Sequence, residues 1–146
     1  MTSVKIFLYA GILLLVTACS QEPATIHYGS DECTHCKMMI TDPQFASQVV
    51  TDKGKAYKFD AIECMAVYHQ ENSDELEGAK LWVNNYDTPG DWLAAEKAQY
   101  VKSEVVKSPM GKSLLAFPSQ EDAEKHVDEK PGTLLNWQQV SEINIG

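Results

Sequence analysis

The chain has 146 residues, of which 44% are hydrophobic and 23% charged, and its 21 acidic against 12 basic residues give a formal net charge of -9. This length suits one domain or two small lobes, and the composition is typical of a folded protein and not of a disordered one. Every basic residue is a lysine. The chain therefore lacks the arginine forks with which proteins bind phosphate groups, and we exclude nucleic acid as a partner.

Residues 1–18 are predicted to be a lipoprotein signal peptide. Lys5 precedes an apolar stretch that is too short to be a comfortable transmembrane helix. The stretch ends in Val16-Thr17-Ala18-Cys19, which resembles a bacterial lipobox, with Cys19 as the residue to be acylated. A plain secretory signal with an incidental cysteine is the alternative. Both interpretations place the protein outside the cytoplasm.

The residue after Cys19 is a serine, so the aspartate that retains lipoproteins at the inner membrane is missing. We expect a lipid-anchored protein of the cell envelope that faces the periplasm, attached to the outer membrane. Residues 19–28 are predicted to form a flexible lipidated tether. The folded domain is predicted to span residues 29–146.

Five soft or borderline donor side chains fall within the seven residues from Cys33 to Met39: two thiols, one imidazole and two thioethers, on Cys33, His35, Cys36, Met38 and Met39. Once Cys19 is acylated, the thiols that remain are odd in number, because Cys64 is the third. An exported protein normally pairs its cysteines, so this set does not indicate a disulfide scaffold.

Four interpretations of the Cys33–Cys36 pair stay open on the residues alone. A disulfide there would close a very small loop and add little stability. A redox-active dithiol normally lies where a strand meets a helix N-terminus, which lowers the thiol pKa, whereas this pair follows a polar segment. Structural zinc needs four ligands, and Cys64 with one histidine could complete that set. Cu(I) prefers thiolate and thioether, and the adjacent methionines favour it over zinc.

The first half of the domain is predicted to form a ββαβ unit. Residues 46–51 and 56–59 are typical of two strands joined by an Asp-x-Gly turn. A helix is predicted over 61–71 with Asp60 as its N-cap, followed by a strand over 80–84 and a turn-rich bridge over 85–93. Cys64 lies in this helix beside its apolar face, where a free cysteine is most often a small buried hydrophobe.

The second half repeats this outline in a loose register. Strands are predicted over 100–102, 113–117 and 133–135, with helices over 120–128 and from Asn136 to Val140. The fold class predicted is α+β, with two small ββαβ-like lobes over about 29–88 and 95–146. Between the first two of these strands, Met110 lies in a loop without periodicity. Its thioether is not needed to fill a core there, so we single it out as a candidate metal ligand.

Taken together, these residues resemble the NosL family. The resemblance covers the mature chain in order, and NosL proteins are lipid-anchored accessory proteins encoded with nitrous oxide reductase, with a fold compared to that of organomercurial lyase. The segments that carry it are Cys33-Thr34-His35-Cys36-Lys37-Met38, Phe59-Asp60, Cys64-Met65 and Ser108-Pro109-Met110-Gly111.

The resemblance implies a Cu(I) metallochaperone, not an enzyme, that feeds copper towards nitrous oxide reductase together with a membrane ABC-type assembly complex. By position, Cys33 and Cys36 would supply thiolate and Met110 thioether, and Met38 occupies the methionine position of the motif. A thiol–disulfide oxidoreductase of the cell envelope and a zinc-stabilised interaction module are the alternatives. The number of ligands, a metal bridging two copies, and the roles of His35, Met39 and Cys64 are left open.

Overall fold

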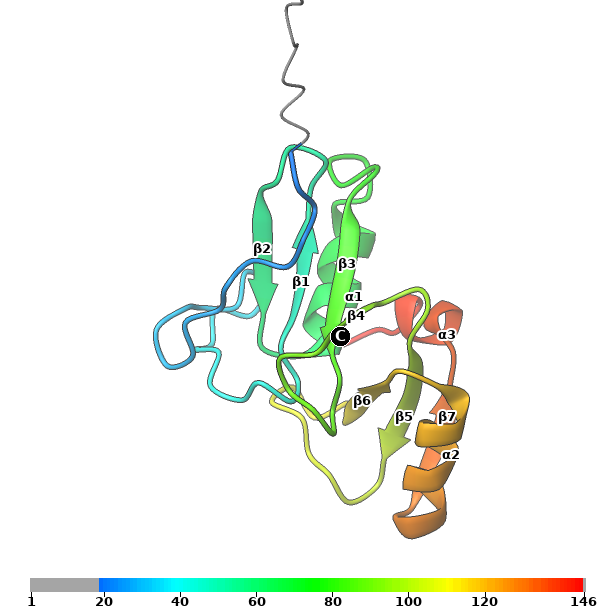
Figure 1. The fold of residues 1–146 in the computed structure, drawn as a ribbon. Coiled ribbons are helices and arrows are strands. Elements are labelled where there is room, and N and C mark those ends of the chain that lie inside the picture. Colours follow the sequence, from blue (N-terminus) through cyan, green and yellow to red (C-terminus); the bar gives the residue numbers. More distant parts are fainter. Residues whose placement is uncertain (1–18, 146) are drawn as a thin grey trace, which may run out of the picture.

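Two antiparallel sheets form the framework of the computed structural model, which describes residues 19–145 (Figure 1). The predicted signal peptide lies outside the described residues. The first sheet has the strand order β2-β1-β3-β4 and the second the order β6-β5-β7. The elements in chain order are β1 (Ser47–Val50), β2 (Ala56–Phe59), α1 (Ile62–Glu71), β3 (Lys80–Asn84), β4 (Trp92–Ala94), β5 (Gln99–Ser103), β6 (Leu114–Phe117), α2 (Gln120–Glu129), β7 (Gly132–Leu135) and α3 (Trp137–Ser141).

The two lobes share one topology. In each lobe the first strand lies in the middle, and it is flanked by the second strand and by the strand that follows the helix, giving 2-1-3 in one sheet and 6-5-7 in the other. The predicted α+β fold with two ββαβ-like lobes is therefore confirmed. The structure adds β4, a three-residue edge strand paired with β3, where the sequence predicted the end of a turn-rich bridge.

Strand β1 is buried along its whole length because both faces of the first sheet are covered. On one face lies α1, and the hydroxyl of Ser47 donates a hydrogen bond to the carbonyl of Ala61 just before that helix, at 3.0 Å. On the other face, the Gln48 side chain exchanges two hydrogen bonds with the backbone of Ala24. Successive side chains of a strand point to opposite faces, which explains why Gln48 faces the N-terminal segment while Ser47 faces α1.

The segment predicted as a flexible tether makes specific contacts with the first sheet (Figure 1). The indole N–H of Trp82 donates a hydrogen bond to the Gln21 carbonyl at 2.9 Å, and the Gln21 side chain donates to the Gly78 carbonyl at 2.8 Å. Further along, Ile26 is buried in the core. Specific contacts with the first sheet are thus made eight residues before residue 29, the predicted start of the folded domain. The polar composition of residues 19–28 suggested a flexible tether, but the side chain and the carbonyl of Gln21 form hydrogen bonds with the folded domain.

One cluster of buried side chains joins the lobes. It contains Val49, Phe59 and Met65 from the first lobe together with Tyr100 and Leu114 from the second. A small lobe of this size buries too little apolar surface to be stable alone, so the shared cluster explains why the two pack together. Within residues 19–145, no helix reaches the length and apolar character that crossing a bilayer would require.

A test of the second lobe is available at Gly132, the first residue of β7. A Cβ atom built there would lie 2.7 Å from Val101 Cγ1 and 3.1 Å from the Lys102 carbonyl oxygen. We expect Gly132→Ala to lower the free energy of unfolding by about 1–3 kcal/mol through overpacking, measured by urea denaturation. Thr133→Ala, at an exposed position of the same strand, serves as the control and should change stability by less than about 0.5 kcal/mol. Equal stabilities for the two variants would contradict the close approach.

Candidate metal centre

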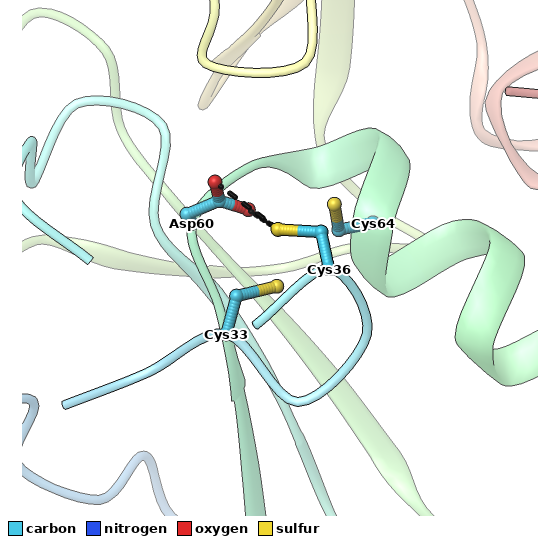
Figure 2. A group of neighbouring side chains, drawn as sticks. All are labelled: Cys33, Cys36, Asp60 and Cys64. Carbon is cyan, nitrogen blue, oxygen red and sulfur yellow. Dashed lines mark hydrogen bonds between the residues drawn. The ribbon is translucent and has the colours of Figure 1, made fainter. Parts of the chain in front are cut away.

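Three thiols and one carboxylate meet at the end of the first sheet, beside the N-terminus of α1. The side chains are those of Cys33, Cys36, Asp60 and Cys64, and their ligand atoms all lie within 4.8 Å of one another. Figure 2 shows the three sulfur atoms and the carboxylate pointing toward a common centre, from a loop on one side and from the start of α1 on the other. Cys33, Cys64 and Asp60 are buried, whereas Cys36 is half-buried.

A closed loop presents Cys33 and Cys36. An isolated β-bridge between Glu32 and Met39 closes its ends, and the backbone N–H of Cys33 donates to the Met38 carbonyl at 2.8 Å. At its tip, Lys37 adopts a left-handed backbone conformation with φ of 65°, which turns the chain back on itself. The Cys-x-x-Cys pair thus lies in a tight turn and not at the start of a helix.

A backbone hydrogen bond attaches this loop to the first sheet. The N–H of Thr34 donates to the carbonyl of Lys58 in β2, at 2.8 Å. The loop is held a second time by the ammonium of Lys58, which lies 2.6 Å from the Asp31 carboxylate. Two residues after Lys58, the chain reaches Asp60, so the pairing brings the loop's thiols to the residues that lead into α1.

Cys64 lies in the first turn of α1 and is completely buried. The interpretation of Cys64 as a small buried hydrophobe described its burial correctly, whereas its approach to Cys33 and Cys36 agrees with the ligand role that the zinc alternative gave it. Asp60 is also reassigned. The N-cap residue is Ala61, which makes no side-chain capping bond, and the Asp60 carboxylate instead accepts from the Cys36 thiol, with both oxygens at 3.5 Å.

The environment divides the three thiols into one acidic and two weakly acidic groups. A hydrogen bond from the Cys64 thiol is the largest effect on Cys33, and it lowers the pKa of Cys33 to about 6 against the opposing effect of burial. Burial raises the pKa of Cys36 to about 11, helped by the neighbouring Cys33 thiolate and Asp60. The hydrogen bond that Cys64 gives to Cys33, followed by burial, raises the pKa of Cys64. Near neutral pH the cluster thus holds one thiolate, on Cys33, which accepts a hydrogen bond from Cys64, while the Cys36 thiol donates to Asp60.

The dimensions of this cluster suit a single metal ion. Metal–sulfur bonds are about 2.3 Å long, so two ligands on opposite sides of one ion are about 4.6 Å apart, close to the observed span. Three thiolates are soft ligands that suit Cu(I), while a fourth, carboxylate ligand would give the tetrahedral set that zinc prefers. Either ion would be reached from the side of Cys36, the one half-buried cysteine of the three.

Other donors of the Cys-x-x-Cys loop lie outside this group. Met38 and Met39 are exposed, with 47% and 52% of their surface accessible. His35 faces the far end of α1, where its Nδ1 lies 3.8 Å from a Glu71 carboxylate oxygen. The assignment of Met38 as a ligand therefore stays a prediction, and His35 is occupied elsewhere.

The loop that carries Met110 packs against the start of α1. The Glu63 carboxylate, one residue before Cys64, accepts hydrogen bonds from the hydroxyl of Ser108 and from the backbone N–H of Lys112. Met110 lies between these two residues and packs half-buried against the core cluster that contains Cys33 and Cys64. Residues from the two lobes thus come together here, although the assignment of Met110 as a ligand stays a prediction.

The family model of NosL matches residues 23–145 of this chain. The chain belongs to the NosL family. The match begins inside the segment predicted as a tether, in agreement with the contacts of that segment with the sheet. It spans both lobes, so the duplicated topology belongs to the family domain as a whole.

Solved structures give an independent comparison of the fold. The chain is similar to the crystal structure of the copper chaperone NosL from Shewanella denitrificans, with a TM-score of 0.67 and 18% sequence identity. The alignment covers 86% of this chain and 97% of the other. The comparison with curated proteins finds no match. At this level of identity the similarity concerns the fold, and the metal centre rests on the residues described above.

Proposed function

We propose that this NosL-family protein is a Cu(I) metallochaperone of the cell envelope. The observation that carries the proposal is the convergence of three thiols, two of them buried, around one point at the start of α1. Soft sulfur ligands select Cu(I) over the harder ions that carboxylates and waters bind. The copper chaperone named among the solved structures has the same fold, which supports the same cargo here.

The chemistry we propose is transfer and not turnover. Cu(I) is stable with two or three ligands, so one of the thiolates from Cys33, Cys36 and Cys64 can leave the metal while a ligand from a partner binds. Cys36 is the most accessible of the three and is the ligand that an incoming thiolate or thioether would replace first. Copper would pass through mixed-ligand intermediates and would not be released into solution.

The partners we propose follow from the resemblance to NosL proteins. Nitrous oxide reductase would receive the copper, with a membrane ABC-type complex taking part in assembly of its copper sites. The lipobox and the exposed Cys19 support attachment to a membrane through acyl chains, at the outer membrane because an aspartate does not follow Cys19. Confinement of carrier and acceptor to one compartment raises their effective concentration.

Anaerobic titration of Cu(I) against a chromophoric chelator tests the proposal. Cys33→Ser and Cys36→Ser are each expected to weaken Cu(I) binding at least about 10-fold to 100-fold, because each removes a thiolate. Met110→Leu keeps the apolar volume and is expected to weaken binding by a smaller factor, about 10-fold. Unchanged retention of Cu(I) in all three variants would overturn the proposal. Met39→Leu, at an exposed position of the same loop, is the matched control.

A zinc-stabilised module is the second candidate, and Asp60 is the observation that favours it. A buried carboxylate beside three thiols completes the tetrahedral set that zinc prefers, whereas Cu(I) has little affinity for carboxylate oxygen. We expect Asp60→Asn to weaken Zn²⁺ binding by about 10-fold or more while Cu(I) affinity changes less than about 3-fold. If Asp60→Asn weakened Cu(I) binding more than Zn²⁺ binding, Asp60 would no longer be evidence for a zinc site. Unfolding of the protein when a chelator removes its bound metal would favour the zinc module over the chaperone.

A thiol–disulfide oxidoreductase is disfavoured by the position of the Cys-x-x-Cys pair. Such enzymes place the attacking cysteine at a helix N-terminus, whereas here the pair lies in a turn and the helix carries Cys64. The protein is therefore expected to show no activity in insulin reduction.

A further inference from the structure

Glu63 is a buried carboxylate that the metal centre itself does not use. The residue is completely buried in the first turn of α1, directly before Cys64. Its Oε1 accepts a hydrogen bond from the Ser108 hydroxyl at 2.5 Å and another from the Lys112 backbone N–H at 3.2 Å. No donor among residues 19–145 reaches its Oε2. A buried carboxylate with so few partners is costly, so it needs an explanation.

The partners of Glu63 are the two ends of one tight loop. The Ser108 hydroxyl also accepts from the Ser113 N–H at 2.8 Å, and the Gly111 N–H donates to the Ser108 carbonyl at 3.0 Å. Gly111 and Ser113 both have a left-handed backbone, with φ of 79° and 61°. Such a conformation is unfavourable for serine and persists where surrounding contacts fix it. The loop is thus folded around the Glu63 carboxylate.

Met110 lies between the two points at which Glu63 holds the loop. Figure 2 shows this loop, in yellow, above the start of α1, where Ser108 donates to Glu63. One turn of α1 therefore carries a thiol of the metal centre on Cys64 and, at the adjacent position, the acceptor that fixes the Met110 loop. Through this single turn the geometry of the loop from the second lobe depends on the helix of the first.

We propose that Glu63 is a positioning residue, which holds the Met110 loop at the metal centre so that the thioether completes the Cu(I) site. The inference rests on the proposed Cu(I) function and extends it by a residue that touches no metal. Glu63 acts through its acceptor oxygen. Glu63→Gln keeps that oxygen and the shape of the side chain, so it should hold the Met110 loop in place as the wild type does.

The experiment follows Met110 directly. The full mature chain, labelled with [methyl-¹³C]methionine, is titrated anaerobically with Cu(I) in parallel with chelator competition, for wild type, Glu63→Gln, Glu63→Leu, Met110→Leu and the double variant Glu63→Leu/Met110→Leu. In wild type and Glu63→Gln the Met110 methyl signal should shift on copper addition. In Glu63→Leu the shift should be lost, and Cu(I) affinity should fall about as far as in Met110→Leu.

The double variant separates positioning from general destabilisation. If Glu63 acts only through Met110, the double variant should bind Cu(I) no more weakly than Met110→Leu, within about 2-fold, because the two residues then share one effect. Val101→Ala, in the core of the second lobe and away from this loop, should lose stability without losing the Met110 shift. Additive losses in the double variant, or a Met110 shift retained in Glu63→Leu, would overturn the inference.

The same titration distinguishes this inference from the proposed function. Copper that still binds to the cysteines of Glu63→Leu, without the Met110 shift, supports positioning. A wild-type Met110 signal that does not move while the cysteines bind copper overturns the positioning role and leaves the chaperone intact. Absence of Cu(I) binding in wild type would overturn both.

Discussion

Replacement of Cys64 by serine is expected to lower the Cu(I) affinity at least about 100-fold, which corresponds to about 2.7 kcal/mol. The reason is geometric. Cys64 is completely buried, and its sulfur faces both Cys33 and Cys36 within 4.8 Å, so we expect it to act as a ligand and not only to fill space. Loss of a ligand should cost at least as much as loss of a residue that merely orients one.

The measurement is chelator competition under anaerobic conditions, beside the Cys33→Ser and Cys36→Ser variants. Met65→Leu is the matched control, because Met65 is the next residue of α1, is equally buried and would keep nearly the same volume. It should bind Cu(I) as wild type does. A Cys64→Ser protein that retains wild-type affinity would restrict the site to the Cys-x-x-Cys pair and restore the interpretation of Cys64 as a core residue.

The second large effect is the dependence of affinity on pH. Near pH 7.5 the Cys33 thiol, with a pKa of about 6, is ionised, while Cys36, with a pKa of about 11, and Cys64, whose pKa is also raised, are protonated. Coordination by all three thiolates should therefore release about two protons per metal. Because each released proton changes the apparent affinity about 10-fold per pH unit, affinity should fall about 100-fold for each unit from pH 8 to pH 6.

Below pH 6 the slope should steepen, because Cys33 is then protonated as well and about three protons leave. Calorimetry in two buffers of different ionisation enthalpy counts the protons directly. In Cys64→Ser the serine hydroxyl can still donate to the Cys33 thiolate, so that variant should release about one proton near pH 7.5. Release of one proton by the wild type would mean that only two thiolates bind the metal.

Most of the fold was predictable because its elements are local. Segments typical of strands, the Asp-x-Gly turn and helical spacing identified β1, β2, α1 and the corresponding elements of the second lobe within a few residues. β4 escaped because a three-residue edge strand after a Pro-Gly turn leaves no periodic pattern. The contacts of the N-terminal segment could not be predicted, because its partners Gln48 and Trp82 lie far away in the sequence.

The candidate site was predictable only in its local half. Cys33 and Cys36 stand out by their spacing, whereas Cys64 and Asp60 join them only through the pairing of Thr34 with Lys58, which no sequence pattern specifies. Asp60 precedes a helix and therefore matched the usual capping position, but its carboxylate turns toward a thiol. Glu63 lies where acidic residues are common, in the first turn of a helix, so nothing in the sequence sets it apart. Its hydrogen bond with Ser108 joins the two lobes and appears only in the structure.

With Cys19 acylated as proposed, the contacts of Gln21 with the first sheet would limit how the domain moves relative to a membrane. Ser20 and Cys19 lie against the β1–β2 turn, within 3.4 and 3.9 Å of where a Cβ on Gly54 would be. An acyl chain on Cys19 would thus leave almost no slack between lipid headgroups and the folded protein. The cysteines of the metal centre lie at the opposite end of β2 from this turn. A four-residue strand is about 13 Å long, so the centre is about that far from Cys19 along the strand. Copper, the proposed cargo, would then be held at a nearly constant distance from the lipid, and an acceptor would have to come to it.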